Sequence, residues 1–385
     1  MRRKILLALA VAILLAGAVF WWLSRPLPIL NVVTWPGTYG RAQAAAQMQA
    51  YGAAKRVDVR IQQWADNGTL DELKRAIAAH RAGDVVDLEM PVAVAACKAG
   101  LLEPIDPATL PAGDDGTAAA ADFYKGMINP CFVASAAYSQ MIVCRKPCLG
   151  NLPDLFNRAR QSSMPPVAGK PGHYDQFART TGIQKIGLQR AAKVTLEMAL
   201  LADGVSADQV YDVLGTDAGV ARAFARLDTI KANIIWWRNA DEPVQLLRGR
   251  LVAATTILTA QAQAVLQKNA GLSDQDTDLV PFGPQFYEAD VLALPKGGAK
   301  MERALDYLRF ATSSAPLANM VKFAPYMPPR RSSLPLVEKL PPSPTRDFVT
   351  SQKGMMEKSF AIDDAFWAEH GAALEARFRA WADAP

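Results

Sequence analysis

Residues 57–106 constrain the fold more than any other stretch, because strand and helix patterns alternate along them. Residues 57–61 alternate apolar and polar side chains with period two, which predicts a half-buried strand. Thr69, with Glu72 three residues later, predicts a helix N-terminus with a capping box. Gly83 predicts the end of that helix.

A second strand follows at residues 85–89, and a helix begins at Pro91. Two strands joined by one helix over so short a stretch predict a parallel sheet with a right-handed crossover. Ligands of such sheets bind beyond the carboxyl ends of the strands. Asp87 and Glu89 lie near that end and are the first candidate site residues. Either acid could instead cap the helix at Pro91, because acids are common at helix N-termini.

The segment GDVVDLE, continued by CKAGLLEPID, resembles the extracellular solute-binding proteins of bacterial ABC transporters, of the spermidine/putrescine-binding type. The resemblance extends over nearly the whole chain beyond its N-terminus. It implies an α/β fold of two lobes, as in type II periplasmic binding proteins. Each lobe would hold a mixed, mainly parallel sheet flanked by helices, and crossover strands would join the lobes.

The resemblance also predicts how the chain is divided, and 385 residues are enough for two domains. Residues 1–26 form a signal peptide or membrane anchor. The first lobe takes residues 27–135 and 270–330, and the second lobe takes 136–269. Residues 331–385 form a C-terminal helical segment that packs on the lobes.

The N-terminus carries a targeting segment. Three basic residues at positions 2–4 precede an unbroken apolar run at residues 5–23. The run is long enough to span a bilayer, but Ala16-Gly17-Ala18 offers a cleavage site, so an uncleaved anchor and a cleaved signal peptide both stay open. The positive-inside rule places the rest of the chain outside the cytoplasm. We expect a periplasmic protein, free or tethered to the inner membrane.

Four cysteines are present, an even number that suits an exported protein. The resembled family often has cysteines at the positions of Cys97 and Cys131, so the resemblance predicts a disulfide between them. Cys144 and Cys148 either close a second, small loop or are buried free thiols. The 3 histidines lack ligand spacing, and we expect neither a metal site nor a cofactor.

Aromatic residues supply further ligand candidates. Residues 30–40 resemble the family's opening strand, W-x-G-x-Y-G and helix. Trp35 and Tyr39 would contact an alkyl chain or attract an ammonium group, unless they pack under the following helix. Tyr138 lies on a strand that resembles the family's crossover into the second lobe, where core packing is the alternative. Tyr326 lies in a loop that resembles Y-I-P-Y-G-P, which contacts ligands in the family.

The apolar segment 234–237 predicts a strand that ends in two tryptophans. Neighbouring side chains on a strand point to opposite faces, so we predict Trp237 in the ligand site and Trp236 in the core. Residues 255–260 replace the family's S-A-Y-N-G-R, so Thr256, or Thr259, is the hydrogen-bonding candidate there.

The segment YEADVLALPKG resembles the family's Y-D-x-D-Y-W-A-I-P-K-G, in which an acid pairs with the ligand amine and aromatic residues line the site. Asp290 is retained and Glu288 replaces the other acid. Val291 and Leu292 replace the aromatic pair. The charges of a polyamine site therefore partly persist, whereas its aromatic box does not.

These patterns favour a binding protein over an enzyme. The chain has no Ser-His-Asp set, P-loop or H-E-x-x-H motif. Its formal charge is +5, but four basic residues lie in or beside the N-terminal segment, and no basic stripe argues for nucleic acid.

The resemblance implies a monomer that captures a small organic cation, such as putrescine or spermidine, by closure of the lobes and delivers it to an inner-membrane ABC permease. The four acids would hold the ammonium groups, and Trp35, Tyr39 and Trp237 the methylenes. One alternative is a membrane-anchored sensory or scaffolding protein on the same fold with a diverged site. The other is a periplasmic redox or metal protein that uses Cys144 and Cys148.

Overall fold

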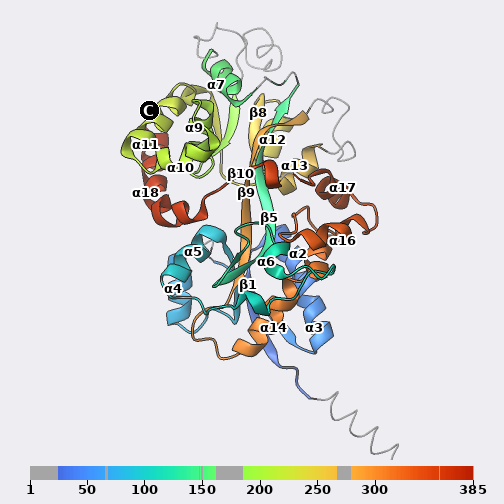
Figure 1. Cartoon of the computed structure of the whole chain (residues 1–385). Helices are drawn as coiled ribbons and strands as arrows, with labels where there is room; N and C mark the ends of the chain where they lie inside the picture. Colours follow the sequence, from blue (N-terminus) through green and yellow to red (C-terminus); the bar gives the residue numbers. More distant parts are fainter. Residues whose placement is uncertain are drawn as a thin grey trace, which may run out of the picture.

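The computed structural model describes residues 25–65, 68–146, 148, 151–161, 185–266, 279–354 and 356–384. Two α/β lobes lie one above the other, and two long strands run through both (Figure 1). The two-lobe mixed α/β fold predicted from the sequence is confirmed.

The sheet of lobe 1 begins with three parallel strands. Strand β1 (Ile29–Thr34) lies between β2 (Asp58–Gln63) and β3 (Val85–Glu89), so the parallel arrangement predicted for this stretch is confirmed. Helix α4 (Leu70–Ala78) carries the chain from β2 to β3. It begins as predicted, because the N–H of Glu72 donates to the Thr69 hydroxyl at 3.2 Å.

Helices cover both faces of this sheet (Figure 1). They are α2 (Gly37–Gln43), α3 (Gln49–Lys55), α5 (Met90–Lys98), α6 (Ala119–Asp122), α14 (Met301–Ala311) and α15 (Ser314–Met320). A wider helical turn at Ala44–Met48 joins α2 to α3 without a break. The glycine-containing segment at residues 36–40 was expected to precede a helix from Arg41, but the helix already begins at Gly37.

Lobe 2 contains a second set of parallel strands. Strand β6 (Ile186–Gln189) lies between β7 (Ile234–Trp237) and β8 (Ala254–Leu258), and the strand predicted at residues 234–237 is confirmed. The helices of this lobe are α7 (Leu152–Gln161), α9 (Thr195–Ala202), α10 (Val210–Leu214), α11 (Asp217–Asp228), α12 (Glu242–Arg248) and α13 (Thr259–Leu266).

Two antiparallel strands join the lobes into one continuous sheet. Strand β9 (Leu279–Ala293) pairs with β3 in lobe 1, β5 (Phe132–Arg145) pairs with β8 in lobe 2, and β5 and β9 pair with each other. The pairing shifts register between Ala134 and Ala136 and between Gln140 and Ile142. Such irregularities bend and twist a strand, which allows one ladder to pass from lobe to lobe.

The chain beyond residue 331 forms helices α16 (Leu334–Glu338) and α17 (Pro344–Ser351), strand β10 (Phe360–Ala361) on β9, and helix α18 (Asp364–Asp383). Helix α18 packs on lobe 2 through the fully buried Phe378 and through Trp367, whose indole N–H donates to Glu197 at 2.7 Å. The same helix lies beside α5 of lobe 1 (Figure 1). The C-terminal helix therefore contacts both lobes.

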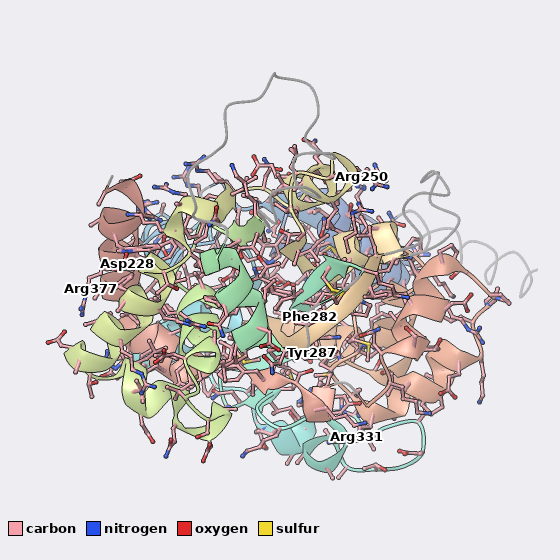
Figure 2. All side chains as sticks on the ribbon, turned by 90° about the horizontal axis from the view of Figure 1, so that it is seen from above. Asp228, Arg250, Phe282, Tyr287, Arg331 and Arg377 are labelled. Carbon is pink, nitrogen blue, oxygen red and sulfur yellow. A yellow bond between two sulfur atoms is a disulfide. The ribbon has the colours of Figure 1, made fainter. Side chains whose placement is uncertain are left out.

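Seen from above, Phe282 and Tyr287 of β9 lie near the middle of the molecule, whereas Asp228 and Arg377 lie at its edge (Figure 2). Arg377 on α18 pairs with Asp217 at 2.8 Å in solvent, where a salt bridge contributes little to stability.

A buried arginine fixes the C-terminal segment to lobe 1. Arg330 is 0% exposed, and its Nε donates to Asp122 at 2.5 Å. Its terminal nitrogens donate to the carbonyls of Thr312 and Pro111 at 3.0 and 2.9 Å. The guanidinium also stacks over Phe123, with 4.8 Å to the ring centroid. Nothing in the local sequence pattern predicted this cluster.

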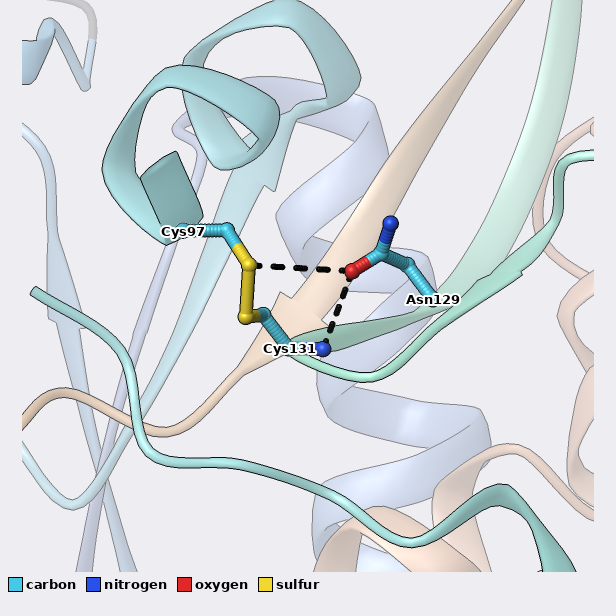
Figure 3. Close-up of a disulfide and its surroundings, with 3 residues drawn as sticks. All are labelled: Cys97, Asn129 and Cys131. Carbon is cyan, nitrogen blue, oxygen red and sulfur yellow. Dashed lines mark hydrogen bonds between the residues drawn. A yellow bond between two sulfur atoms is a disulfide. The ribbon is translucent and has the colours of Figure 1, made fainter. Parts of the chain in front are cut away.

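Both predicted disulfides are present, which resolves the alternative of free thiols. Cys97 at the end of α5 joins Cys131 at the start of β5 across 5.8 Å between Cα atoms (Figure 3). The backbone N–H of Cys131 also donates to Asn129 at 3.0 Å. Cys144 and Cys148 close a short loop at the end of β5, so no free thiol supports the redox alternative.

Within the described ranges, no helix combines the length and the apolar composition needed to cross a membrane. The apolar run at residues 5–23 lies outside those ranges.

Candidate functional site

Asp87, near the carboxyl end of β3, is the centre of a buried hydrogen-bond network. Its carboxylate accepts from Trp35 Nε1 at 2.9 Å, from the Tyr39 hydroxyl at 2.8 Å and from Ser135 at 3.3 Å. The Gln43 amide donates to the same carboxylate. Asp87 is 0% exposed, so these donors satisfy its carboxylate oxygens in place of water. The same hydrogen bonds fix the rings of Trp35 and Tyr39.

Asp290 on β9 differs from Asp87 in the hydrogen bonding of its carboxylate. It lies directly across the ladder from Glu89 and is 7% exposed. Among the described residues, no side chain donates a hydrogen bond to its carboxylate. Burial, and then the charges of Asp87 and Glu89, raises the pKa of Asp290 well above its ordinary value. A buried carboxylate without a donor can accept a cationic group, because unpaired buried charge is unfavourable.

Lys193, which follows β6 in lobe 2, connects the two lobes electrostatically. Its ammonium pairs with Glu288 on the crossover strand and, at 3.4 Å, with Glu89 of lobe 1. Burial lowers the pKa of Lys193, but the two glutamates raise it by more, so the net direction is upward and the side chain stays charged. Glu89 occupies the N-cap position of α5 but makes no capping hydrogen bond, so Lys193 is its partner instead.

The C-terminal helix adds a fifth acid. Asp364 begins α18, and burial, followed by the nearby charge of Glu288, raises its pKa to about 7, whereas Lys193 lowers it. Its buried Oδ1 has no hydrogen-bond partner among the described residues. We name the following group the acidic cluster: Asp87, Glu89, Glu288, Asp290 and Asp364, with Lys193.

Three predicted tyrosines lie at the acidic cluster. The rings of Tyr39 and Tyr326 meet edge to face with centroids 5.1 Å apart. Tyr138 pairs with Glu288 across the β5–β9 ladder. Burial, and then the charges of Glu288 and Asp290, raises the pKa of Tyr138 well above its ordinary value. Together with Trp35, these rings provide apolar surface beside the carboxylates.

The structure does not bring Trp237 and Thr256 to the acidic cluster. Trp237 is 1% exposed in the core of lobe 2, and its indole N–H donates to Thr256 at 3.1 Å. Trp236 packs against Phe378 and Trp381 of α18. The two tryptophans do point to opposite faces of β7, as predicted. Both faces are covered, one by α12 and the other by α18.

Four contributors to the site carry no signal in the sequence: Gln43, Ser135, Lys193 and Asp364. Gln43 is one polar residue on a helix, and Ser135 lies in the largely apolar first half of strand β5. Lys193 and Asp364 come from the loop after β6 and from the start of the last helix. Only the fold brings these residues to the acidic cluster.

The pKa shifts predict how the stability of the ligand-free protein depends on pH. Burial raises the pKa of Asp87 to about 7, against the hydrogen bonds of Tyr39 and Gln43 that lower it, and Asp364 also titrates near 7. Both values exceed the ordinary carboxyl pKa of about 4 in an unfolded chain. The folded state thus binds these protons more tightly. This contribution to stability is full below about pH 4 and is lost as pH rises through 7.

We therefore expect the Tm of the ligand-free protein to rise between pH 8 and pH 5 in calorimetry. Asp364→Asn, which mimics the protonated acid, should raise Tm at pH 8 and reduce the remaining pH dependence. A Tm that is flat or falls from pH 8 to pH 5, equally in both proteins, would contradict these pKa assignments.

Two lobes on one shared sheet, with a buried polar site supplied by both, define a two-lobe ligand-binding protein. The family described as bacterial extracellular solute-binding protein matches residues 46–346, and the chain belongs to this family. Its members are extracellular, in the periplasm of bacteria, and deliver a small-molecule ligand to an ABC permease. The resemblance to ABC solute-binding proteins is thus confirmed.

Individual relatives bind different ligands. The gamma-aminobutyric acid-binding protein of Pseudomonas aeruginosa is 30% identical, over 90% of this chain and 89% of its own. The solved structure of the Atu4243 GABA receptor is 25% identical with a TM-score of 0.71, over 92% of this chain and 98% of its own. The glucopine complex of MotA from A. tumefaciens B6 shares the fold at 18% identity, with a TM-score of 0.69 and coverage of 92% and 99%.

Proposed function

We propose that this protein captures a small ligand that carries a primary ammonium group, bound between the lobes at the acidic cluster, for delivery to an ABC permease. The observation that carries the proposal is Asp290, a buried carboxylate that no described side chain hydrogen-bonds, beside four further acids. A ligand ammonium would pair with it and offset the cost of burying both charges. The neighbouring aromatic rings would hold the methylenes of the ligand.

Lys193 supports a zwitterionic ligand over a polyamine. Its ammonium already pairs with Glu288 and Glu89, where a polyamine would place one of its own cations. A ligand carboxylate would instead find Lys193 as its partner. Val291 and Leu292, which replace the aromatic pair, are fully buried in the core of lobe 1, so these positions supply no aromatic ring to hold a polyamine. Two relatives named for GABA point the same way, so we propose an ω-amino acid such as GABA.

The excess of carboxylates over Lys193 keeps the polyamine as the second candidate. Calorimetric titration and thermal shift of the purified protein with GABA, butyrate, butylamine, putrescine and spermidine separate the two. We expect GABA at a hundredfold excess over its Kd to add about 2.7 kcal/mol of stability, and butyrate to add none. Putrescine and butylamine should bind more weakly than GABA.

Lys193→Gln should weaken GABA binding tenfold or more and leave butylamine binding within threefold. Lys74→Gln is the matched control, because Lys74 is exposed and, among the described residues, pairs only with Asp71 on α4. Tighter binding of putrescine than of GABA would return the assignment to a polyamine. Equal binding of butyrate and GABA would exclude an essential ammonium group.

We further propose that the protein acts as a monomer whose residues 5–23 direct it to the periplasm, either as a signal peptide or as a tether. The mass of the mature protein distinguishes these outcomes directly. An intact N-terminus, together with no thermal shift for any compound of the panel, would favour the anchored sensory or scaffolding alternative over transport.

A further inference from the structure

Lobe 1 contains a second polar pocket on its side remote from lobe 2. It lies between α3 and α14, beside the point where the chain enters β1 (Figure 1). Its volume is about 660 Å³, which is within the range of sites that hold small organic ligands. Its polar lining comes from Tyr51, Lys55, Lys300, Glu302, Arg303, Asp306 and Arg309.

Positive charge prevails in this pocket after its ion pairs are assigned. Lys55 pairs with Asp306 at 3.2 Å, and Lys300 pairs with Asp84 at 3.1 Å. Asp306 also accepts from the Tyr51 hydroxyl at 2.9 Å. The guanidinium groups of Arg303 and Arg309 remain. The other acid of the lining, Glu302, is exposed to solvent.

The two arginines retain unused donors. Arg303 donates from one terminal nitrogen to the carbonyl of Ile29 at 3.2 Å, which uses one of its five N–H groups. The Nε of Arg309 is buried and has no acceptor among the described residues. A guanidinium fork matches the oxygens of a phosphate group in pairs, more closely than the point charge of a lysine does.

We propose that this pocket binds a phosphate-bearing anion, with the phosphate held by Arg303 and Arg309. Lys55 and Lys300 add long-range attraction, and Val57 and Met301 provide apolar wall for the carbon part of the ligand. Neither arginine belongs to the acidic cluster, so the proposal does not rest on the function proposed for the interlobe site.

Two sources supply such an anion: a soluble phosphate ester and the headgroup of an anionic phospholipid. Pro28 lines the pocket and lies five residues after Leu23, the last residue of the apolar run. Five residues of extended chain span at most about 18 Å. If the run is retained in a bilayer, it holds this face of lobe 1 within reach of the headgroups.

The test uses the full chain in zwitterionic nanodiscs made of phosphatidylcholine. Inorganic phosphate and glycerol 1-phosphate are titrated by calorimetry. Separate nanodiscs with one third phosphatidylglycerol are compared by hydrogen exchange of α14. We expect phosphate or glycerol 1-phosphate to bind, or phosphatidylglycerol to slow the hydrogen exchange of α14. Either effect should weaken when salt is raised from 50 to 200 mM. Arg309→Gln should reduce the affinity for the phosphate probe fivefold or more. The double variant Arg303→Gln with Arg309→Gln should reduce this affinity tenfold or more.

Arg60→Gln is the matched control, because Arg60 is an exposed cation of the same lobe whose one ion pair within the described ranges is with Asp58. It should leave binding within twofold. A Tm within a few degrees of that of the unmodified protein verifies the fold of each variant. Response to glycerol 1-phosphate assigns a soluble ester, and response to phosphatidylglycerol alone assigns the lipid. No response to any phosphate probe, or one that both arginine variants leave unchanged, overturns the proposal.

Discussion

Asp290→Asn is expected to weaken ligand binding at least a hundredfold, or about 2.7 kcal/mol. The amide keeps the shape of the side chain but removes the charge, so the ligand ammonium is buried without its partner. Loss of one member of a buried ion pair typically costs about 3–5 kcal/mol. The ligand-free protein should become more stable at pH 8, because the charge of Asp290 is then removed from beside Asp87 and Glu89.

Calorimetric titration with the ligand that gives the largest thermal shift measures the first effect, and the Tm of the ligand-free variant measures the second. Asp208→Asn, at an exposed acid of lobe 2, is the control and should change neither. If Asp290→Asn binds within threefold of the unmodified protein, Asp290 is not the partner of the ligand ammonium.

Arg330→Met is expected to lower the free energy of unfolding by about 3–5 kcal/mol, the usual cost of removing one member of a buried ion pair. Methionine fills part of the space but leaves Asp122, which is 1% exposed, with only the N–H and hydroxyl of Ser332 as donors. The carbonyls of Thr312 and Pro111 also lose their donors.

Urea unfolding of the two proteins measures this loss. Arg377→Met is the control at an exposed pair with Asp217 and should cost less than about 1 kcal/mol. The double variant Arg330→Met with Asp122→Leu should recover part of the loss, because it leaves no buried carboxylate. A loss below about 1 kcal/mol in Arg330→Met would contradict the assigned role of this cluster.

The sequence predicted those parts of the fold that local patterns specify. Strands at residues 85–89 and 234–237 were predicted with the bounds that the structure has, because each is a short segment in which β-branched or aromatic residues predominate or lead. Thr69 and Glu72 specified the start of α4 through a local hydrogen bond. The disulfide of Cys97 followed from family resemblance, since connectivity depends on tertiary structure.

The site was predictable only in part. Asp87 and Asp290 follow from strand ends and from a family motif. Lys193 and Asp364 lie in segments with no local pattern, and only the tertiary fold brings them together. The alternation of side chains along a strand correctly predicted that Trp237 and Trp236 point to opposite faces of β7. It could not predict which helix covers each face. That depends on α12 and α18, which lie elsewhere in the chain.

The pairing of β3 with β9 places Glu89 opposite Asp290, so the edge of β3 is completed by a strand that lies much later in the chain. Until then that edge stays unsatisfied, and the early segments cannot complete their sheet. Contacts so distant in sequence slow folding. Because this ladder places Glu89 opposite Asp290, we expect the acidic cluster to form only after β9 has paired with β3.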